Sequence, residues 1–95
     1  MSAPKSATRA RQRARELLVK ALYQWQLADH SLTELNRQFA LDPDFARIDQ
    51  DYFRELLAAV LADVPALDGL IARQPVRSLD QLDAVGRAIL LLALA

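Results

Sequence analysis

The feature that most constrains the fold is a run of six apolar side chains between residues 53 and 71. They recur at alternating spacings of four and three residues: Phe53, Leu57, Val60, Val64, Leu67 and Ile71. This spacing places every member on one face of an α-helix, which has about 3.6 residues per turn. No convincing run elsewhere in the chain alternates with period two. The sequence therefore predicts an all-α fold.

The unbroken phase of these residues predicts one long helix that begins near Asp49, is kinked at Pro65 and ends before Pro75. A proline inside a helix removes a backbone donor and bends the helix axis. The alternative is two separate helices that meet near Pro65.

Capping signals indicate where the neighbouring helices begin. In Ser31-Leu-Thr-Glu34, the serine and the glutamate have the spacing at which each satisfies a backbone N–H group of the other. This predicts a short helix that runs to about Leu41 and is ended by Asp42-Pro43-Asp44. Asp83 predicts the N-cap of a further helix, and Ser78-Leu-Asp-Gln81 predicts a brief helical turn before it.

A first helix is predicted from about Thr8 to Ala28, because small and apolar residues form one stripe along it. The stripe consists of Ala10, Ala14, Leu17, Leu18, Ala21, Trp25 and Ala28. We expect this stripe to face the core. Val19, Tyr23 and Leu27 fall outside it, so another helix or a partner is expected to cover them. Residues 1–7 are expected to form a disordered tail, and residues 8–95 one helical domain.

The N-terminal half of this first helix is strongly basic. Four arginines and two lysines (Lys5, Arg9, Arg11, Arg13, Arg15 and Lys20) accompany a single acid, Glu16, between residues 5 and 20. The chain has zero formal net charge, so this segment carries +5 and the remainder −5. Cations are disfavoured at a helix N-terminus, and like charges four residues apart repel by about 0.2–0.5 kcal/mol per pair. A bound polyanion such as nucleic acid would relieve this repulsion; a solvated basic helix end is the alternative.

Helical phase places these cations on both flanks of the core stripe. Arg9, Arg13 and Lys20 lie on one side, and Arg11 and Arg15 lie on the other. A curved polyanion could therefore contact both flanks of the helix.

Few residues of this chain can support catalysis or metal binding. It has no cysteine, one histidine, and two glycines, Gly69 and Gly86. These counts exclude disulfides, thiolate metal sites and a glycine-rich phosphate loop. Asp29-His30-Ser31 holds the residue types of a nucleophilic triad, but consecutive residues cannot easily converge as a triad requires. We therefore expect no enzyme acting alone, no cofactor and no metal.

The ends of the chain carry no membrane signal. Met1 is followed by polar and small residues without the apolar stretch of a signal peptide, which leads us to expect a cytoplasmic protein. The longest apolar run, from Ala88 to Ala95, is too short to span a bilayer. Because a helix that is apolar all round is normally buried, we expect its packing partners to be missing. We expect four leucines to be exposed there: Leu90, Leu91, Leu92 and Leu94. The protein is then expected to be an oligomer, a chain stabilised by a partner, or an incomplete chain.

Short motifs along the chain occur in the order seen in one bacterial family. They are Arg13-Ala-Arg-Glu16, Ala21-Leu-Tyr-Gln-Trp-Gln-Leu27, Asp51-Tyr-Phe-Arg-Glu-Leu-Leu57, Leu67-Asp-Gly-Leu-Ile71, and Leu79-Asp-Gln-Leu-Asp83 with Arg87-Ala-Ile-Leu90. Through this ordered set the chain resembles the NusB family of transcription antitermination factors. The resemblance implies a helical bundle that binds RNA and pairs with NusE, a protein of the small ribosomal subunit. The pair is expected to bind boxA elements in nascent ribosomal RNA leaders and to help RNA polymerase pass terminators.

The resemblance also implies roles for single residues. In the family the arginine-rich start of the first helix contacts RNA, which here implies Arg11, Arg13 and Arg15. Lys5, Arg9 and Lys20 are added to this set on charge and helical phase. Tyr23 and Leu27 match positions that face NusE.

Other motif residues are expected to have structural roles. Trp25, Tyr52 and Phe53 are predicted to pack in the core, although an indole can also stack on an RNA base. Arg54 and Glu55 are predicted to lie on the surface.

The chain departs from the family pattern in two places. Gly86 stands where glutamate is often found, so the reciprocal cap with Asp83 is lost and the helix is weakened by up to about 1 kcal/mol. This position belongs to the region that faces NusE, and the strength of that interaction is in question. The family also continues beyond Ala95 through further helices, so an incomplete bundle is expected, with the first three helices and the start of the second half.

Two other functions remain open from sequence alone. The chain could be the NusB-like RNA-binding region of a ribosomal RNA cytosine methyltransferase, with a catalytic domain after it. It could also be a helical adaptor without catalytic activity, in which the arginines only provide solubility.

Overall fold

The computed structural model of the chain describes residues 5–73 and 83–95, with side chains from residue 7 onward. This part of the chain forms α-helices and one short 3₁₀-helix, and no strand occurs in it. The elements are α1 (Lys5–Ala28), α2 (Leu32–Phe39), η1 (Phe45–Arg47), α3 (Gln50–Ala62), α4 (Val64–Ala72) and α5 (Ala84–Leu94). The all-α prediction is confirmed.

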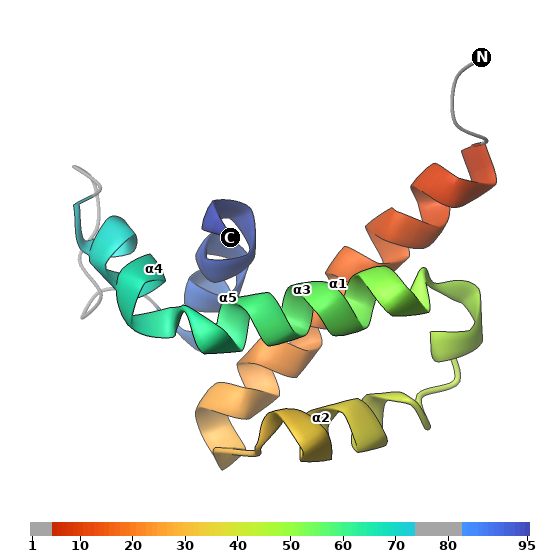
Figure 1. The fold of residues 1–95 in the computed structure, drawn as a ribbon, viewed down its shortest axis with the longest axis horizontal. Coiled ribbons are helices and arrows are strands. Elements are labelled where there is room, and N and C mark those ends of the chain that lie inside the picture. Colours follow the sequence, from red (N-terminus) through yellow and green to blue (C-terminus); the bar gives the residue numbers. More distant parts are fainter. Residues whose placement is uncertain (1–4, 74–82) are drawn as a thin grey trace.

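Helix α1 is the centre of the arrangement. It packs against α5, α3, α2 and η1, while α4 packs against α3 and α5. In Figure 1, α3 crosses α1, and α4 and η1 stand at opposite ends of α3. Four elements, α2, η1, α3 and α5, are therefore positioned by direct contact with α1.

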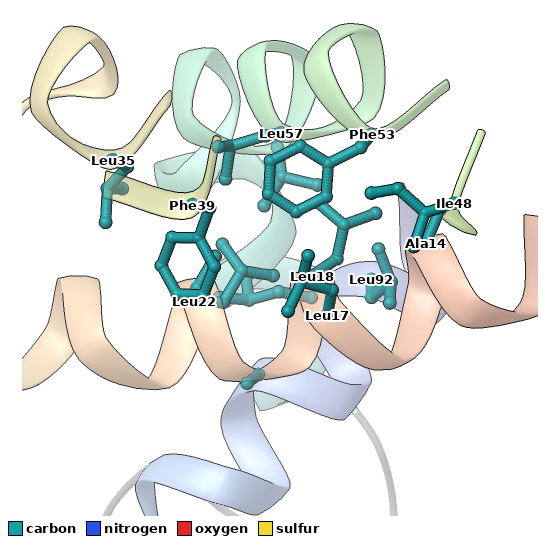
Figure 2. Close-up of a cluster of buried hydrophobic side chains, with 14 of the residues drawn as sticks. Ala14, Leu17, Leu18, Leu22, Leu35, Phe39, Ile48, Phe53, Leu57 and Leu92 are labelled. Atoms are coloured by element: carbon teal, nitrogen blue, oxygen red, sulfur yellow. The ribbon is translucent and has the colours of Figure 1, made fainter. Parts of the chain in front are cut away.

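The hydrophobic core lies between α1, α2 and α3 and extends to α5 (Figure 2). Phe53 is fully buried at its centre, and its ring contacts two others. The centre of the Phe39 ring lies 6.0 Å from the centre of the Phe53 ring in a tilted arrangement, and that of the Phe45 ring lies 5.6 Å from it in an edge-on arrangement. Such aromatic pairs add about 0.5–1.5 kcal/mol beyond the area that they bury. The core position predicted for Phe53 is confirmed.

Helix α1 begins at Lys5, three residues before the predicted start. Residues 5–7, which were expected in the tail, belong to the helix because nothing between Pro4 and Thr8 interrupts helical structure. The predicted stripe is buried at its centre (Ala14, Leu17, Leu18 and Ala21), half-buried at Ala10 and Trp25, and exposed at Ala28. Leu22 is fully buried, which the stripe did not include.

Helix α2 has the predicted capping box. The Ser31 hydroxyl accepts a bond from the Glu34 backbone N–H, and Glu34 Oε1 accepts one from the Ser31 backbone N–H, each at 3.2 Å. The bond from the Ser31 backbone N–H stabilises the charged Glu34 carboxylate and, with a further contribution from the Ser31 side chain, lowers the pKa of Glu34 below its ordinary value. The helix ends at Phe39, two residues before the predicted Leu41, because Phe39 is drawn into the core while Leu41 is exposed. The 3₁₀-helix η1 that follows was not predicted.

The prediction of one long helix kinked at Pro65 was wrong, and the alternative of two helices is confirmed. The break is at Asp63, whose backbone (φ −122°, ψ 16°) leaves the helical region. Pro65 takes a place in the first turn of α4, where its missing N–H needs no partner. The predicted apolar face nevertheless points to the core on both sides of the break, since Phe53, Leu57, Val60, Leu67 and Ile71 are all buried. Val64, the sixth member, lies at the break and is only half-buried.

Helix α5 has the predicted N-cap at Asp83, but its leucines are not exposed as expected. Leu91 and Leu92 are buried and Leu90 and Leu94 are half-buried, because α5 packs along α1. The exposed large apolar residues of α5 are Val85 and Ile89 instead. The turn predicted over Ser78–Gln81 lies outside the described residues. In the part of the chain that the structure describes, no helix is both long and apolar enough to cross a membrane.

Candidate nucleic-acid interface

The basic residues of α1 divide into two groups on the two flanks of the helix. Arg9, Arg13 and Lys20 are exposed on one flank, as helical phase predicted. On the other flank Arg11 is exposed and Arg15 is half-buried. Lys5 belongs to the first turn of α1, and its side chain lies outside the described part of the structure.

Arg15 is bonded inside the protein. Its Nη1 donates to the Tyr52 hydroxyl at 2.8 Å, and its Nη2 donates to the Leu92 carbonyl at 3.5 Å. One guanidinium group thus joins α1 to α3 and to the C-terminal turn of α5. Sequence reasoning assigned Arg15 to RNA contact alone and did not foresee this bridge, because it joins residues far apart in the chain.

Arg11 is also held against α3. Its Nε lies 3.7 Å from Asp49 Oδ2, and its guanidinium carbon lies 5.7 Å from the centre of the Tyr52 ring. Asp49 caps α3 at the same time, because its Oδ1 accepts the Tyr52 backbone N–H at 3.1 Å. Since two thirds of the Arg11 side chain remains exposed, this ion pair is weak and leaves Arg11 accessible to an anion.

The opposite flank of α1 forms one wall of a hollow of about 220 Å³. The hollow lies between α1 and the η1 segment, and it is lined by Arg13, Glu16, Leu17, Lys20, Asp44, Arg47 and Ile48. Among the described residues, the guanidinium groups of Arg13 and Arg47 and the Lys20 ammonium have no hydrogen-bond or ion-pair partner within the protein. Sequence reasoning missed Arg47, because only the return of η1 to α1 brings it beside Arg13.

An apolar groove adjoins this basic flank toward the C-terminal half of α1. It has a volume of about 450 Å³ and is lined by Val19, Lys20, Tyr23, Gln24, Leu27 and Val85. Tyr23 and Leu27 are exposed, at 39% and 64%, as expected from their place outside the core stripe. Lys20 lines both this groove and the basic hollow, so the two surfaces are continuous.

Gly86 lies in the first turn of α5, next to Val85 in the groove. Its backbone N–H donates to Asp83 Oδ1 at 2.6 Å, so the aspartate still caps α5. With glycine in place of glutamate, no side chain at this position can return a bond to Asp83. Gly86 is half-buried, and its neighbour Arg87 anchors the helix start.

Arg87 connects α5 with α1 and α4. Its guanidinium binds both carboxylate oxygens of Asp68, with Nε donating to Oδ1 at 3.0 Å, and its Nη1 donates to Gln26 Oε1 at 3.2 Å. The same group lies 5.5 Å from the Trp25 ring. Trp25 is half-buried and packs against the core, as predicted, and this cation covers part of its ring. The arrangement fixes the α5 side of the apolar groove.

Comparison with known proteins identifies the family of this chain. The family model described as the NusB family matches residues 12–95, which include most of α1 and all later elements. The chain belongs to the NusB family. This agrees with the resemblance carried by the ordered motifs.

Relatives from three bacteria are each named transcription antitermination protein NusB. The chain is 46% identical to the one from Edwardsiella ictaluri over 85% of its own length and 58% of the relative's. It is 44% identical to that of Yersinia enterocolitica and 42% identical to that of Photorhabdus laumondii, over 90% of its own length and 62% of theirs. The chain thus spans about three fifths of the length of these relatives. The name of each relative describes a protein of transcription antitermination.

Proposed function

We propose that the chain is an RNA-binding transcription antitermination factor that acts together with NusE. In this proposal the pair binds boxA-type RNA in nascent ribosomal RNA leaders and alters elongation by RNA polymerase. Membership of the NusB family, with relatives named for antitermination, is the observation that carries the proposal.

The basic side of α1 supports the RNA half of the proposal. Phosphate contacts supply most of the sequence-independent affinity of nucleic-acid binding, and they require accessible cations. Arg9, Arg13 and Lys20 are exposed on one flank, and Arg11 is largely exposed on the other. Arg15 has part of its guanidinium committed to Tyr52, so we propose that it positions the flank as well as contacting RNA. The choice of boxA would come from contacts to base edges, as in other single-strand recognition.

The apolar groove supports the NusE half. Tyr23 and Leu27 present exposed apolar surface next to Val85, and Gly86 lies beside it in α5. A tyrosine that offers both ring surface and a hydroxyl is typical of protein interfaces. We propose that this groove receives NusE, so that the partner lies immediately next to the RNA.

A gel-shift titration with a boxA-type RNA oligonucleotide, with and without purified NusE, tests this function. We expect binding by the chain alone at low salt and tighter binding with NusE. About four phosphate contacts, at about −0.7 each for single strands, predict a slope near −3 for the logarithm of affinity against the logarithm of salt concentration. Circular dichroism under the same conditions verifies that the chain is folded.

Two kinds of result would contradict the proposal. The first is the absence of any RNA shift at low salt by a folded chain, with NusE present. The second is RNA binding that does not depend on the cations of α1, seen as a salt-independent affinity or as an affinity unchanged when Arg11, Arg13 and Arg15 are replaced together by alanine. The first result would favour a helical adaptor without RNA-binding activity, and the second would show that the cations of α1 do not hold the RNA.

A further inference from the structure

The hollow between α1 and η1 combines cations from two separate elements. Arg13 and Lys20 reach it from α1, and Arg47 reaches it from η1. Among the described residues, no side chain of the protein pairs with any of the three. On the other flank of α1, by contrast, Arg11 and Arg15 both have internal partners. The side chains of Arg9, Arg37 and Arg73 also have no hydrogen-bond or ion-pair partner among the described residues, but none of them lines this hollow. The hollow therefore brings together three unpaired cations from two elements.

The wall that carries Arg47 is held firmly against α1. Phe45 and Ile48, on either side of Arg47, are buried in the core, and Figure 2 shows Ile48 beside Ala14 of α1. The Asp49 backbone N–H donates to the Ala10 carbonyl at 3.0 Å, and Gln50 Nε2 donates to the Phe45 carbonyl at 3.2 Å. A wall fixed before binding loses little conformational freedom when a ligand enters.

The lining also indicates the chemistry of the ligand. Two carboxylates, Glu16 and Asp44, stand among the three cations, and the apolar side chains of Leu17 and Ile48 complete the lining. Phosphate oxygens can bind only the cations, whereas the carboxylates accept bonds from hydroxyl or amino groups. A ribonucleotide offers all of these groups: a phosphate, a 2′-hydroxyl and base amino hydrogens. The volume of about 220 Å³ is below that of sites that enclose drug-sized ligands, so the hollow suits part of a strand, such as a phosphate with its ribose, rather than a free nucleotide.

We propose that this hollow is a nucleotide subsite, in which Arg47 together with Arg13 and Lys20 holds one phosphate of the RNA strand. Glu16 accepts a hydrogen bond from the ribose 2′-hydroxyl of the same nucleotide, and Asp44 accepts one from its ribose or base. This inference rests on the proposed RNA-binding function, which it extends from α1 to η1. It adds Arg47 as a residue that contacts RNA. Because a carboxylate accepts the 2′-hydroxyl, the subsite is also selective for RNA over DNA.

Replacing Arg47 by alanine tests the phosphate contact. We expect boxA-type RNA to bind about fivefold more weakly at low salt, with the salt slope shallower by about 0.7. Arg47→Lys, which keeps the charge, should retain the slope of the unaltered chain. Arg73→Ala is the matched control: Arg73 is an exposed arginine at the C-terminal end of α4, and Figure 1 shows α4 at the opposite end of α3 from η1. It should leave affinity and slope unchanged.

Replacing Glu16 by glutamine tests the nucleotide contact, measured with RNA and DNA oligonucleotides of the same sequence. If the carboxylate accepts the 2′-hydroxyl, the ratio of RNA to DNA affinity should fall by at least about threefold. If Glu16 only repels phosphate, RNA and DNA affinities should change by the same factor, and the nucleotide subsite would be rejected.

The outcomes separate this inference from the function on which it rests. RNA binding by the unaltered chain that Arg47→Ala leaves unchanged would overturn the subsite and leave the proposed function intact. A loss equal to that of Arg73→Ala would also overturn the subsite, because it would reflect net charge alone. Failure of the unaltered, folded chain to bind any RNA would remove both.

Discussion

The hydrogen bond between Arg15 and Tyr52 should contribute to the free energy of unfolding. The charge pattern of α1 alone does not lead to this expectation. Replacing Tyr52 by phenylalanine removes the hydroxyl that accepts the Arg15 Nη1–H bond and keeps the aromatic ring. The 2.8 Å bond has good length, and both side chains are half-buried. Hydrogen bonds to charged groups contribute about 1.5–3 kcal/mol, and partial exposure to water reduces this, so we expect a loss of about 1 kcal/mol in the free energy of unfolding.

A double-mutant cycle isolates this interaction from the other contacts of each residue. Arg15→Met removes the bond to Tyr52 and the longer bond to the Leu92 carbonyl, and it keeps an apolar stem against α3. Urea unfolding of the unaltered chain, both single variants and the double variant, followed by circular dichroism, should give a coupling energy of about 1 kcal/mol. Arg13→Met, on the other flank, should be additive with Tyr52→Phe. An Arg15–Tyr52 coupling below about 0.3 kcal/mol would refute the bridge.

Three further predictions concern the core, the capping box and α4. Phe53→Ala should cost about 3–5 kcal/mol in the free energy of unfolding, because the ring is fully buried among two others; urea titration that finds less than about 2 kcal/mol would contradict the core described above. Gly69→Ala should stabilise the chain by about 0.5–1 kcal/mol, since nothing lies within 4 Å of the added methyl group; a loss of thermal stability would show an unforeseen clash. The pKa of Glu34 is lowered by its bonds to Ser31, so this carboxylate stabilises the fold above its ordinary pKa, and the contribution disappears as the pH falls through the lowered value. The stability difference between the unaltered chain and Glu34→Ala should therefore be full at neutral pH and shrink in acid, and a difference that does not vary with pH would rule this out.

Local signals in the sequence predicted the starts of α2, α3 and α5 well. Ser31, Asp49 and Asp83 each cap the helix that follows, through bonds that span three residues or fewer. Such bonds depend only on neighbours in the chain, so residue type and spacing are sufficient to predict them. The apolar phase of residues 53–71 was predicted equally well, because one face of α3 and α4 meets the same core.

The errors arose where tertiary contacts decide between local alternatives. A proline can kink a helix or begin a new one, and the choice at Pro65 depends on the backbone at Asp63, which no local pattern indicates. Burial of Leu91 and Leu92 depends on the packing of α5 along α1. From sequence alone, an all-apolar helix without visible partners was expected to remain exposed.

The candidate site was predicted only in part, for the same reason. Helical phase placed Arg9, Arg13 and Lys20 on one flank of α1, as the structure has them. It could not show that Arg15 is bonded to Tyr52, 37 residues away. Nor could it bring Arg47 to the hollow, because the 3₁₀-helix that carries it has no clear sequence signal. Which of these residues contact RNA stays a prediction.

A nuclear magnetic resonance titration would show whether the basic residues of α1 hold an RNA strand. The isotope-labelled chain would be titrated with boxA-type RNA, in the presence of unlabelled NusE if required, and amide shifts followed residue by residue. We expect the largest changes to fall between Arg9 and Lys20, with a second group around Arg47. Changes confined to other surfaces, with the amides of α1 unaffected at saturation, would contradict this expectation.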